Sequence, residues 1–418
     1  MFAPANLQFF LLMKTFVSIL VICLFVGYGL QVQAVERADS VSCFDHAISA
    51  PAFRITHAGI PVIVGGMAIY GANTNLKDAA AAGSHAQRYD TQYEDYLQYA
   101  PGVALLALKI GGMEGRSSWS RMIVSDAFSA ALTIGVAEGL KRSVCETRPD
   151  GEDDRAFPSG HTAISYMLAT MLHKEYGCRS PWISLGGYAV ATATAASRMV
   201  HNRHWTSDIV VGAGIGVLMT EVGYYLADLI FKERGLSEWV YADPLDRWRR
   251  PSFLSTDLAM SFPLTQYSLP GGLVKPTVGI NAGVQGAYFF NPYAGVGGSA
   301  VMAVLPIEYN GVLSQEPMNA ARFMAGAYFS YPVFSQLRLG AKAVAGYAYY
   351  GDCRLDGTVR IGGRSTACME VGVSASLLTA ESFGFRLFCD YGLGGSYVAG
   401  HNGAAQYVTV GGSASIYF

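Results

Sequence analysis

Three short clusters in the first half of the chain combine fixed cations with histidines and a carboxylate. They read Lys141-x6-Arg148-Pro149, Pro158-Ser159-Gly160-His161 and Ser197-Arg198-x5-His204-x3-Asp208. A phosphate ester is a dianion whose transition state spreads negative charge over the equatorial oxygens, so its hydrolysis calls for positive donors held in place. Lys141, Arg148 and Arg198 are three such donors, and an arginine can grip phosphate through two parallel hydrogen bonds. These residue types therefore indicate a phosphate site.

The second cluster stands directly before a stretch of helical character. A helix start offers free backbone N–H groups and the positive end of the helix dipole to an anion. We expect Ser159 to cap this helix and to donate its hydroxyl to the phosphate. Gly160 would let the backbone approach a phosphate oxygen with no Cβ in the way.

His204 and Asp208 are four residues apart, so on a helix they would lie on one face, one turn from each other. A carboxylate that accepts a hydrogen bond from one ring nitrogen fixes the tautomer of a histidine and leaves the other nitrogen as a nucleophile. The spacing therefore predicts an activated His204.

Each cluster also has an ordinary interpretation when it is taken alone. Lys141 and Arg148 suit a basic helix end that complements the dipole, and single histidines suit routine helix positions. His173 and His201 fall outside the clusters, and we expect them to be such routine residues. The acidic run at 150–154 is expected to be a solvated loop and not a metal site.

All three clusters, in this order and with these spacings, resemble the three-part signature of the PAP2 (type 2 phosphatidic acid phosphatase) superfamily. That superfamily is similar to the bacterial class A acid phosphatases and the vanadium haloperoxidases. The resemblance covers residues 120–240 directly, and a six-helix layout extends it to 50–235.

The resemblance implies a histidine phosphatase that needs neither a metal nor another cofactor, because the cations do the electrostatic work. His204 would attack phosphorus to form a phosphohistidine, with Asp208 as its catalytic partner. His161 would protonate the leaving alkoxide and later help to activate water. The phosphate would be bound by Lys141, Arg148, Ser159, Gly160 and Arg198.

Apolar stretches of helical length fill the first half of the chain, which is rich in Ala, Gly, Leu and Met. They lie at about 57–73, 97–113, 121–142, 160–174, 182–199 and 208–231. Residues 235–252 hold the prolines and charges expected of a linker. We predict an all-α, PAP2-like six-helix bundle within a domain at 35–234.

After the linker the hydrophobic period becomes two. In 366–377 the odd positions are apolar and the even ones are mostly small or polar, and 338–349 and 384–393 show the same pattern. Such strands also suit a soluble β-sandwich. Their length, the alternation of long and short connections and a C-terminal aromatic residue favour an outer-membrane barrel. With a weak first strand at 254–268, we predict an antiparallel eight-stranded transmembrane β-barrel at 253–418.

The N-terminus and the composition indicate export. Residues 1–34 have a lysine, an apolar run of about fifteen residues and a small-x-small cleavage site, which predicts a signal peptide; an uncleaved anchor helix is the alternative. The chain is 51% hydrophobic with a formal charge of −2, so it lacks the basic excess that nucleic-acid binding requires. The high apolar content also excludes intrinsic disorder.

Six cysteines remain after the predicted cleavage. They are Cys43, Cys145, Cys178, Cys353, Cys368 and Cys389. None forms a CxxC pair, so a zinc site of that kind has no support. In an oxidising compartment Cys353 and Cys368 could form a disulfide, and closing this loop would stabilise the fold by roughly 3 kcal/mol. Two free thiols are the alternative.

The placement of the helical domain has two interpretations. Charges at mid-bilayer are costly unless they turn inward, and several helical stretches contain them. They are Lys109, Asp126, Glu138, Glu221 and Asp228. We therefore expect a periplasmic or membrane-peripheral phosphatase domain, tethered to the outer membrane of a bacterial cell envelope by the barrel. A multi-pass inner-membrane protein is the alternative.

Together these observations predict hydrolysis of a phosphomonoester or pyrophosphate, on a lipid or lipid-linked head group or on a small phosphate ester. One alternative is a vanadate-dependent haloperoxidase on the same scaffold, in which His204 would ligate vanadate. The lysine at 141 and the modest domain size favour the phosphatase. The other is a structural or binding barrel whose helical domain has lost activity, and the complete set of matched residues argues against it.

Overall fold

The structure is a computed structural model. It describes residues 55–56, 58–72, 93–149, 151–201, 203–231, 251–269, 271–314, 317–333, 337–355, 360–380, 383–398 and 403–418. The predicted signal peptide at 1–34, Cys43 and almost all of the predicted linker at 235–252 lie outside these residues, so the domain boundaries stay predictions. Every element named below lies in one compact unit, residues 58–418.

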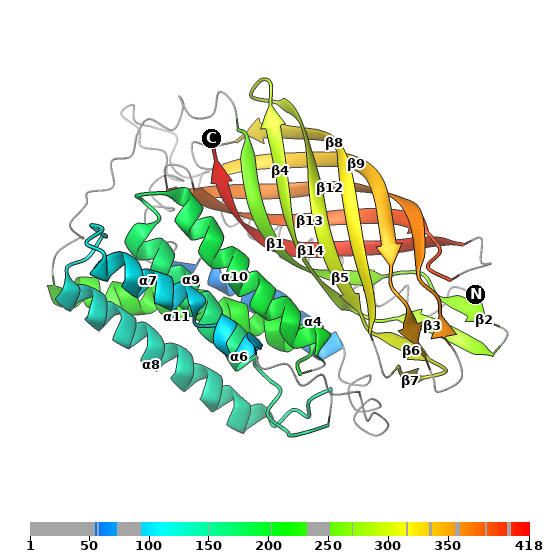
Figure 1. Ribbon diagram of the computed structural model, residues 1–418, viewed down its shortest axis with the longest axis horizontal. Coiled ribbons are helices and arrows are strands. Elements are labelled where there is room, and N and C mark those ends of the chain that lie inside the picture. Colours follow the sequence, from blue (N-terminus) through cyan, green and yellow to red (C-terminus); the bar gives the residue numbers. More distant parts are fainter. Residues whose placement is uncertain are drawn as a thin grey trace, which may run out of the picture. The chain divides into compact units, whose positions relative to one another are not determined.

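Each predicted helical stretch contains a helix, and the described residues before 251 hold no strand, which confirms the all-α first half (Figure 1). The helices are α4 (Gly59–Ala72), α6 (Tyr93–Leu97), α7 (Ala100–Ile110), α8 (Trp119–Val144), α9 (Gly160–Tyr176), α10 (Pro181–Val200) and α11 (Thr206–Phe231). The stretch predicted at 97–113 differs, because the chain breaks between α6 and α7. Pro101 stands in the first turn of α7, where a proline costs no helical hydrogen bond.

Helix α11 is the centre of the helical part and contacts α4, α8 and α9. Its glycines allow this close packing. A Cβ on Gly212 would lie 2.6 Å from the carbonyl oxygen of Ser159, so only glycine lets α11 pass the start of α9 at this distance. The contact matters for function because both helix starts carry residues of the predicted site.

Charged side chains within the helices find partners inside the helical part. The pairs include Tyr224 with Asp126, Lys174 with Glu221, and Arg116 and Arg121 with Asp228. Helices α8 and α11 are long and apolar enough to cross a membrane. In the apolar 18-residue stretch of each helix, about a fifth is buried in α8, compared with two thirds in α11. Because the charges are paired, they argue against a membrane position less strongly than the sequence suggested.

Eight long antiparallel strands form a closed barrel. They are β1 (Phe253–Pro263), β4 (Gly279–Phe289), β5 (Ala294–Leu305), β8 (Met318–Pro332), β9 (Leu337–Tyr350), β12 (Arg364–Ala380), β13 (Phe383–Gly395) and β14 (Ala404–Tyr417). The barrel closes where β1 pairs with β14, with Phe253 opposite Tyr417. Closure leaves no unpaired edge. The eight-stranded prediction is confirmed, and the β-sandwich is excluded.

Connections between the strands alternate in length, as predicted. Short turns join β4 to β5, β8 to β9 and β12 to β13, and longer segments make the other connections. Two small sheets lie in the long segments: β2 (Tyr267–Leu269), β3 (Gly272–Pro276), β6 (Ile307–Tyr309) and β7 (Val312–Leu313) form one, and β10 (Cys353–Arg354) and β11 (Arg360–Ile361) the other. The first strand therefore ends at Pro263, and the rest of the stretch predicted at 254–268 leaves the barrel.

The two faces of β12 show which side of the wall is apolar. Met369, Val371 and Val373 are all more than half exposed, whereas Cys368 and Glu370 are buried. A buried side chain on a strand of a closed barrel points into the lumen, so the apolar face is the outer one. This is the reverse of a water-soluble barrel and suits a lipid environment.

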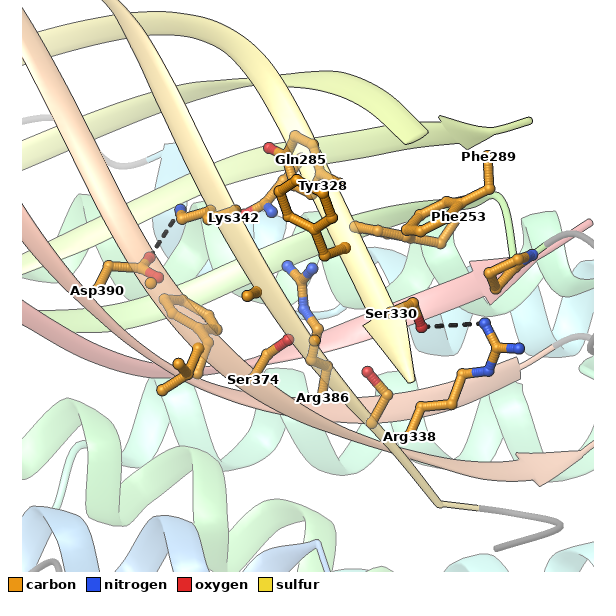
Figure 2. A pocket seen from close by; sticks show the side chains of 18 of the residues that line it. Phe253, Gln285, Phe289, Tyr328, Ser330, Arg338, Lys342, Ser374, Arg386 and Asp390 are labelled. Carbon is orange, nitrogen blue, oxygen red and sulfur yellow. Dashed lines mark hydrogen bonds and ion pairs between the residues drawn. The ribbon is translucent and has the colours of Figure 1, made fainter. Parts of the chain in front are cut away.

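Buried ion pairs cross the lumen. Glu370 lies 3.4 Å from the guanidinium of Arg322 and 3.2 Å from the ammonium of Lys342, and it accepts a hydrogen bond from the hydroxyl of Tyr407 at 3.1 Å. Lys342 also pairs with Asp390 at 2.8 Å. Figure 2 shows this pair beside a cavity of about 40 Å³ in the lumen. Each of these four buried charges thus has a partner of opposite sign, which buried charges need.

No disulfide joins any two cysteines of the described part. Cys353 and Cys368 are both buried and are not bonded to each other, and Cys145, Cys178 and Cys389 are free thiols. Of the two alternatives left open for Cys353 and Cys368, the structure does not have the disulfide.

We predict that Glu370→Gln destabilises the barrel, because it leaves Arg322 and Lys342 buried with less negative charge beside them. Loss of one partner of a buried ion pair costs about 3–5 kcal/mol. Urea titration of the folded barrel in detergent micelles, read by its shift in electrophoretic mobility, measures the change. Glu308→Gln is the matched control, since its pair with Lys275 is more exposed and should contribute less than about 1 kcal/mol. Equal midpoints for the two variants would contradict the lumen network.

Candidate active site

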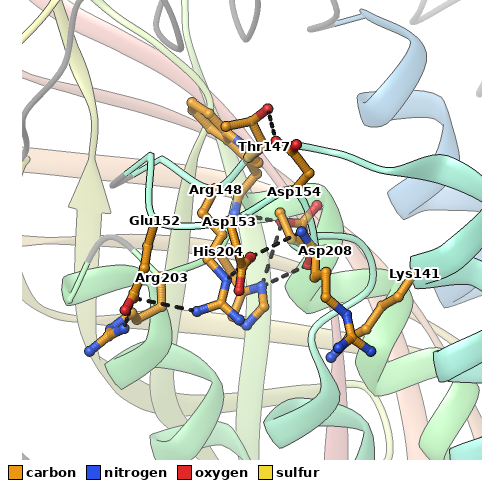
Figure 3. Close-up of polar contacts among 12 residues, drawn as sticks. Lys141, Thr147, Arg148, Glu152, Asp153, Asp154, Arg203, His204 and Asp208 are labelled. Atoms are coloured by element: carbon orange, nitrogen blue, oxygen red, sulfur yellow. Dashed lines mark hydrogen bonds and ion pairs between the residues drawn. The ribbon is translucent and has the colours of Figure 1, made fainter.

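The three sequence clusters come together in the helical part. Figure 3 shows Lys141 and Arg148 of the first cluster with His204 and Asp208 of the third. Lys141 lies in the last turn of α8, and Arg198 in the last turn of α10. Ser159, Gly160 and His161 begin α9. His204 lies in the segment between α10 and α11, close enough to Lys141, Arg148 and Arg198 for these cations to lower its pKa. Five chain segments therefore supply one constellation of cations and imidazoles.

Ser159 caps α9 as the sequence predicts. Its side chain accepts a hydrogen bond from the backbone N–H of Thr162, and its hydroxyl lies 2.9 Å from that of Thr162. Its own backbone N–H donates to the carbonyl oxygen of Asp208 at 3.0 Å. The start of α9 is thus tied to the start of α11, and this fixes one end of the site.

The imidazole of His204 is buried and held by one backbone group. Its Nδ1 lies 2.8 Å from the carbonyl oxygen of Ala156. Because a carbonyl can only accept, Nδ1 carries the proton and Nε2 keeps its lone pair. Burial first, then Arg198 and Arg148, hold the pKa of His204 well below its usual value. The side chain is therefore neutral at neutral pH, as a nitrogen nucleophile must be.

Asp208 does not hold His204 in the way the four-residue spacing suggested. Helix α11 begins at Thr206, so the two residues do not share a helix. Asp208 Oδ2 accepts from the backbone N–H of Trp205 at 2.8 Å and lies 3.7 Å from Nδ1 of His204. The carboxylate thus organises the loop that carries His204 and acts on the imidazole at longer range, while Ala156 makes the direct hydrogen bond.

The described residues of the acidic run, 151–154, form a mostly exposed loop, as expected, and two of them also pair with nearby arginines. Asp153 pairs with Arg148 at 2.9 Å, and Glu152 pairs with Arg203 at 2.6 Å (Figure 3). The carboxylate of Asp153 thus orients the guanidinium of Arg148 beside His204. The position of Arg148 just before the run in sequence could have indicated this pairing.

Gly160 leaves room for the ammonium of Lys141. A Cβ at this position would lie 3.1 Å from Lys141 Nζ, which is closer than ordinary van der Waals contact. The glycine therefore lets the cation lie against the first turn of α9, where the backbone N–H groups also point.

His161 contacts a residue outside the three clusters. Its Nε2 lies 2.9 Å from Oδ1 of Asp95 on α6, and the same carboxylate lies 3.6 Å from Arg198. Burial, followed by the charge of Arg198, lowers the pKa of His161 to about 4, and the hydrogen bond to Asp95 opposes this shift. His204 also lowers the pKa of His161, so the two imidazoles face one region.

His173 lies apart from this constellation. His173 is buried on α9 and forms a hydrogen bond with Ser184 Oγ at 2.8 Å. His201 is buried just after α10. Within the described residues, no group of three histidine, cysteine or acidic side chains is arranged to hold a metal ion.

Residues 123–231 match the PAP2 superfamily, so the chain contains a domain of this superfamily. A lipid A 1-phosphatase of Porphyromonas gingivalis is 38% identical over 201 residues, which are 47% of this chain and 45% of that protein. The match thus spans less than half the length of this curated relative.

Solved structures resemble each half of the chain at low identity. The outer membrane protein OprG from Pseudomonas aeruginosa is 9% identical with a TM-score of 0.31, and covers 41% of this chain and 97% of its own. A PAP2 type phosphatidylglycerolphosphate phosphatase from Bacillus subtilis is 16% identical with a TM-score of 0.28, and covers 42% and 96%. Because these TM-scores are low, only the strand pairing and the helix packing described above establish the fold.

We predict that Gly160→Ala leaves the melting temperature unchanged but weakens the binding of inorganic phosphate about tenfold, a loss of about 1.4 kcal/mol. The added methyl group displaces only the flexible end of Lys141, so folding is spared while the cation moves. Calorimetric titration with phosphate measures the affinity. Gly139→Ala on α8 is the control, because a Cβ there meets nothing within 4 Å. The same phosphate affinity in both variants would contradict the placement of Lys141.

Proposed function

We propose that the protein is a phosphatase that hydrolyses a phosphomonoester or pyrophosphate on a lipid or lipid-linked head group. The single observation that carries this proposal is the state of His204. It is neutral, protonated on Nδ1 by its bond to Ala156, and placed among three cations. A nucleophilic nitrogen at the centre of a positive site is suited to attack on a phosphate dianion.

The reaction follows from these residues. Nε2 of His204 attacks phosphorus, and the bond between phosphorus and the leaving oxygen breaks, which gives a phosphohistidine and an alcohol. Lys141, Arg148, Arg198 and the N–H groups at the start of α9 stabilise the charge on the equatorial oxygens. His161 protonates the leaving oxygen and then, as a base, takes a proton from the water that attacks the phosphohistidine.

A lipid substrate is supported by the relative and by the surface of the helices. The matched relative is a lipid A 1-phosphatase. Val103 and Ile110 on α7 and Ile123 on α8 are all more than half exposed. An apolar surface on α8, the helix whose last turn carries Lys141, would favour a substrate with acyl chains.

The barrel supplies a reason to place the protein in an outer membrane. Exposed aromatic side chains stand near both ends of its wall, as in the two girdles of outer-membrane barrels. Tyr288, Phe290, Tyr293, Phe329 and Tyr331 lie toward the short turns, and Phe323, Tyr347 and Tyr349 toward the long connections. Strand β1 starts at the short-turn end, and short turns face the periplasm in such barrels. We therefore place the phosphatase domain in the periplasm.

The first test is phosphate release by the wild type and by His204→Ala on phosphatidic acid, undecaprenyl pyrophosphate, lipid A and a soluble ester. We expect the wild type to cleave at least one lipid substrate. The variant should lose about 10³-fold or more in kcat, because no other group replaces the nucleophile. His173→Asn is the control, since it removes a buried imidazole that lies outside the constellation. Activity retained in His204→Ala would overturn the assigned nucleophile.

The second test is the location of the protein in a Gram-negative cell. We expect the full chain in the outer-membrane fraction, because the apolar outer face of the barrel requires lipid. We also expect a cysteine probe that cannot cross the inner membrane to reach Cys178, which is exposed, once the outer membrane is permeabilised. Recovery in the inner membrane would favour the multi-pass alternative.

A further inference from the structure

Asp95 reaches the site from a helix that carries none of the signature residues. It lies on α6, 66 residues before His161, and its Oδ1 is 2.9 Å from His161 Nε2. The distance to Arg198 Nη1 is longer, 3.6 Å. The hydrogen bond to the imidazole is therefore its stronger contact.

The groups that face His161 come from three segments. Arg198 on α10 and His204 before α11 lower its pKa, and burial lowers it most. Asp95 on α6 raises it, through both the hydrogen bond and its charge. With a pKa of about 4, His161 is neutral at neutral pH in the free site. A general acid needs a proton at the pH at which it works, so the protonated imidazole requires both the Asp95 carboxylate and the negative charge of the bound phosphate dianion beside it.

We propose that Asp95 is a positioning residue that holds His161 by Nε2–H and so turns Nδ1–H toward the leaving oxygen. This inference rests on the proposed phosphatase function and adds a residue to its machinery. A histidine has two ring nitrogens, and a carboxylate that binds one of them fixes both the orientation of the ring and the site of the transferable proton.

Protons and bonds balance in each half of the reaction. In the first, the Nδ1 proton of the imidazolium moves to the leaving oxygen as its bond to phosphorus breaks, and His161 becomes neutral while Asp95 keeps Nε2–H. In the second, Nδ1 takes a proton from water as the water oxygen bonds to phosphorus and the bond to His204 Nε2 breaks. No proton moves to or from Asp95 in either half.

A competing role would place the carboxylate where phosphate binds. Asp95 also lies near Arg198, so it could stand in for a phosphate oxygen and leave when substrate arrives. The two roles differ in the kinetic constant that they affect. Loss of a positioning residue lowers kcat, whereas loss of a competing anion lowers KM.

The experiment compares the wild type with Asp95→Asn and Asp95→Glu on an alkyl phosphate and on an aryl phosphate with a good leaving group. For Asp95→Asn we expect kcat on the alkyl ester to fall about 30-fold, with KM within about twofold. The alkaline limb of the kcat profile should move about one pH unit lower, because an imidazolium without its carboxylate loses its proton at lower pH. The kcat on the aryl ester should fall less than about threefold, since its leaving group needs little protonation. Asp95→Glu should recover most of the rate.

The control is Glu114→Gln, which removes an exposed carboxylate that pairs with Arg179 and is not part of the constellation. The positioning role is overturned if Asp95→Asn matches this control, if it lowers KM with kcat unchanged, or if both esters lose rate equally. If the wild type releases no phosphate from either ester, both the proposed function and this inference are wrong. If the wild type is active and Asp95→Asn is equally active, only this inference is wrong.

Discussion

The hydrogen bond between His204 Nδ1 and the carbonyl oxygen of Ala156 is the interaction on which the site depends. Three cations around an imidazole would oppose its protonation in any case, but they would not choose which nitrogen keeps the proton. The carbonyl makes that choice because it can only accept. Every other contact of the site, from the cap at Ser159 to the pairs of Arg148, serves to place charge around the nitrogen that remains free.

Charge is handled differently in the two halves of the chain. In the helical site, Lys141, Arg148 and Arg198 converge on one region. The acids that pair with them, Glu138, Asp153 and Asp95, each keep more than a third of their side chain exposed, so water screens these pairs and the cations stay available to an anion. In the barrel, Arg322 and Lys342 surround Glu370, whose carboxylate is buried with them. The first arrangement suits the binding of phosphate, and the second suits a lumen in which the buried charges neutralise one another.

Much of the fold could be predicted because the first half of the chain has apolar stretches of helical length and the second half has a hydrophobic period of two residues. Strand β12 shows apolar residues at every second position, and α11 has long apolar runs with glycines, so both elements were expected close to where they lie. The direct partner of His204 could not be predicted in this way. A four-residue spacing indicated Asp208, but α11 begins two residues after His204, and the backbone of Ala156 takes its place.

The sequence by itself determined the two architectures and the set of residues that carry charge to the site, because hydrophobic period and motif spacing are local properties of the chain. Only the tertiary structure decided the partners of those residues. Asp95 lies far from His161 in sequence, and Glu152 pairs with Arg203, which is 51 residues away. A backbone carbonyl oxygen is present in every residue type, so no motif reveals the role of Ala156. Such contacts depend on how helices pack, and packing joins residues that no local pattern connects.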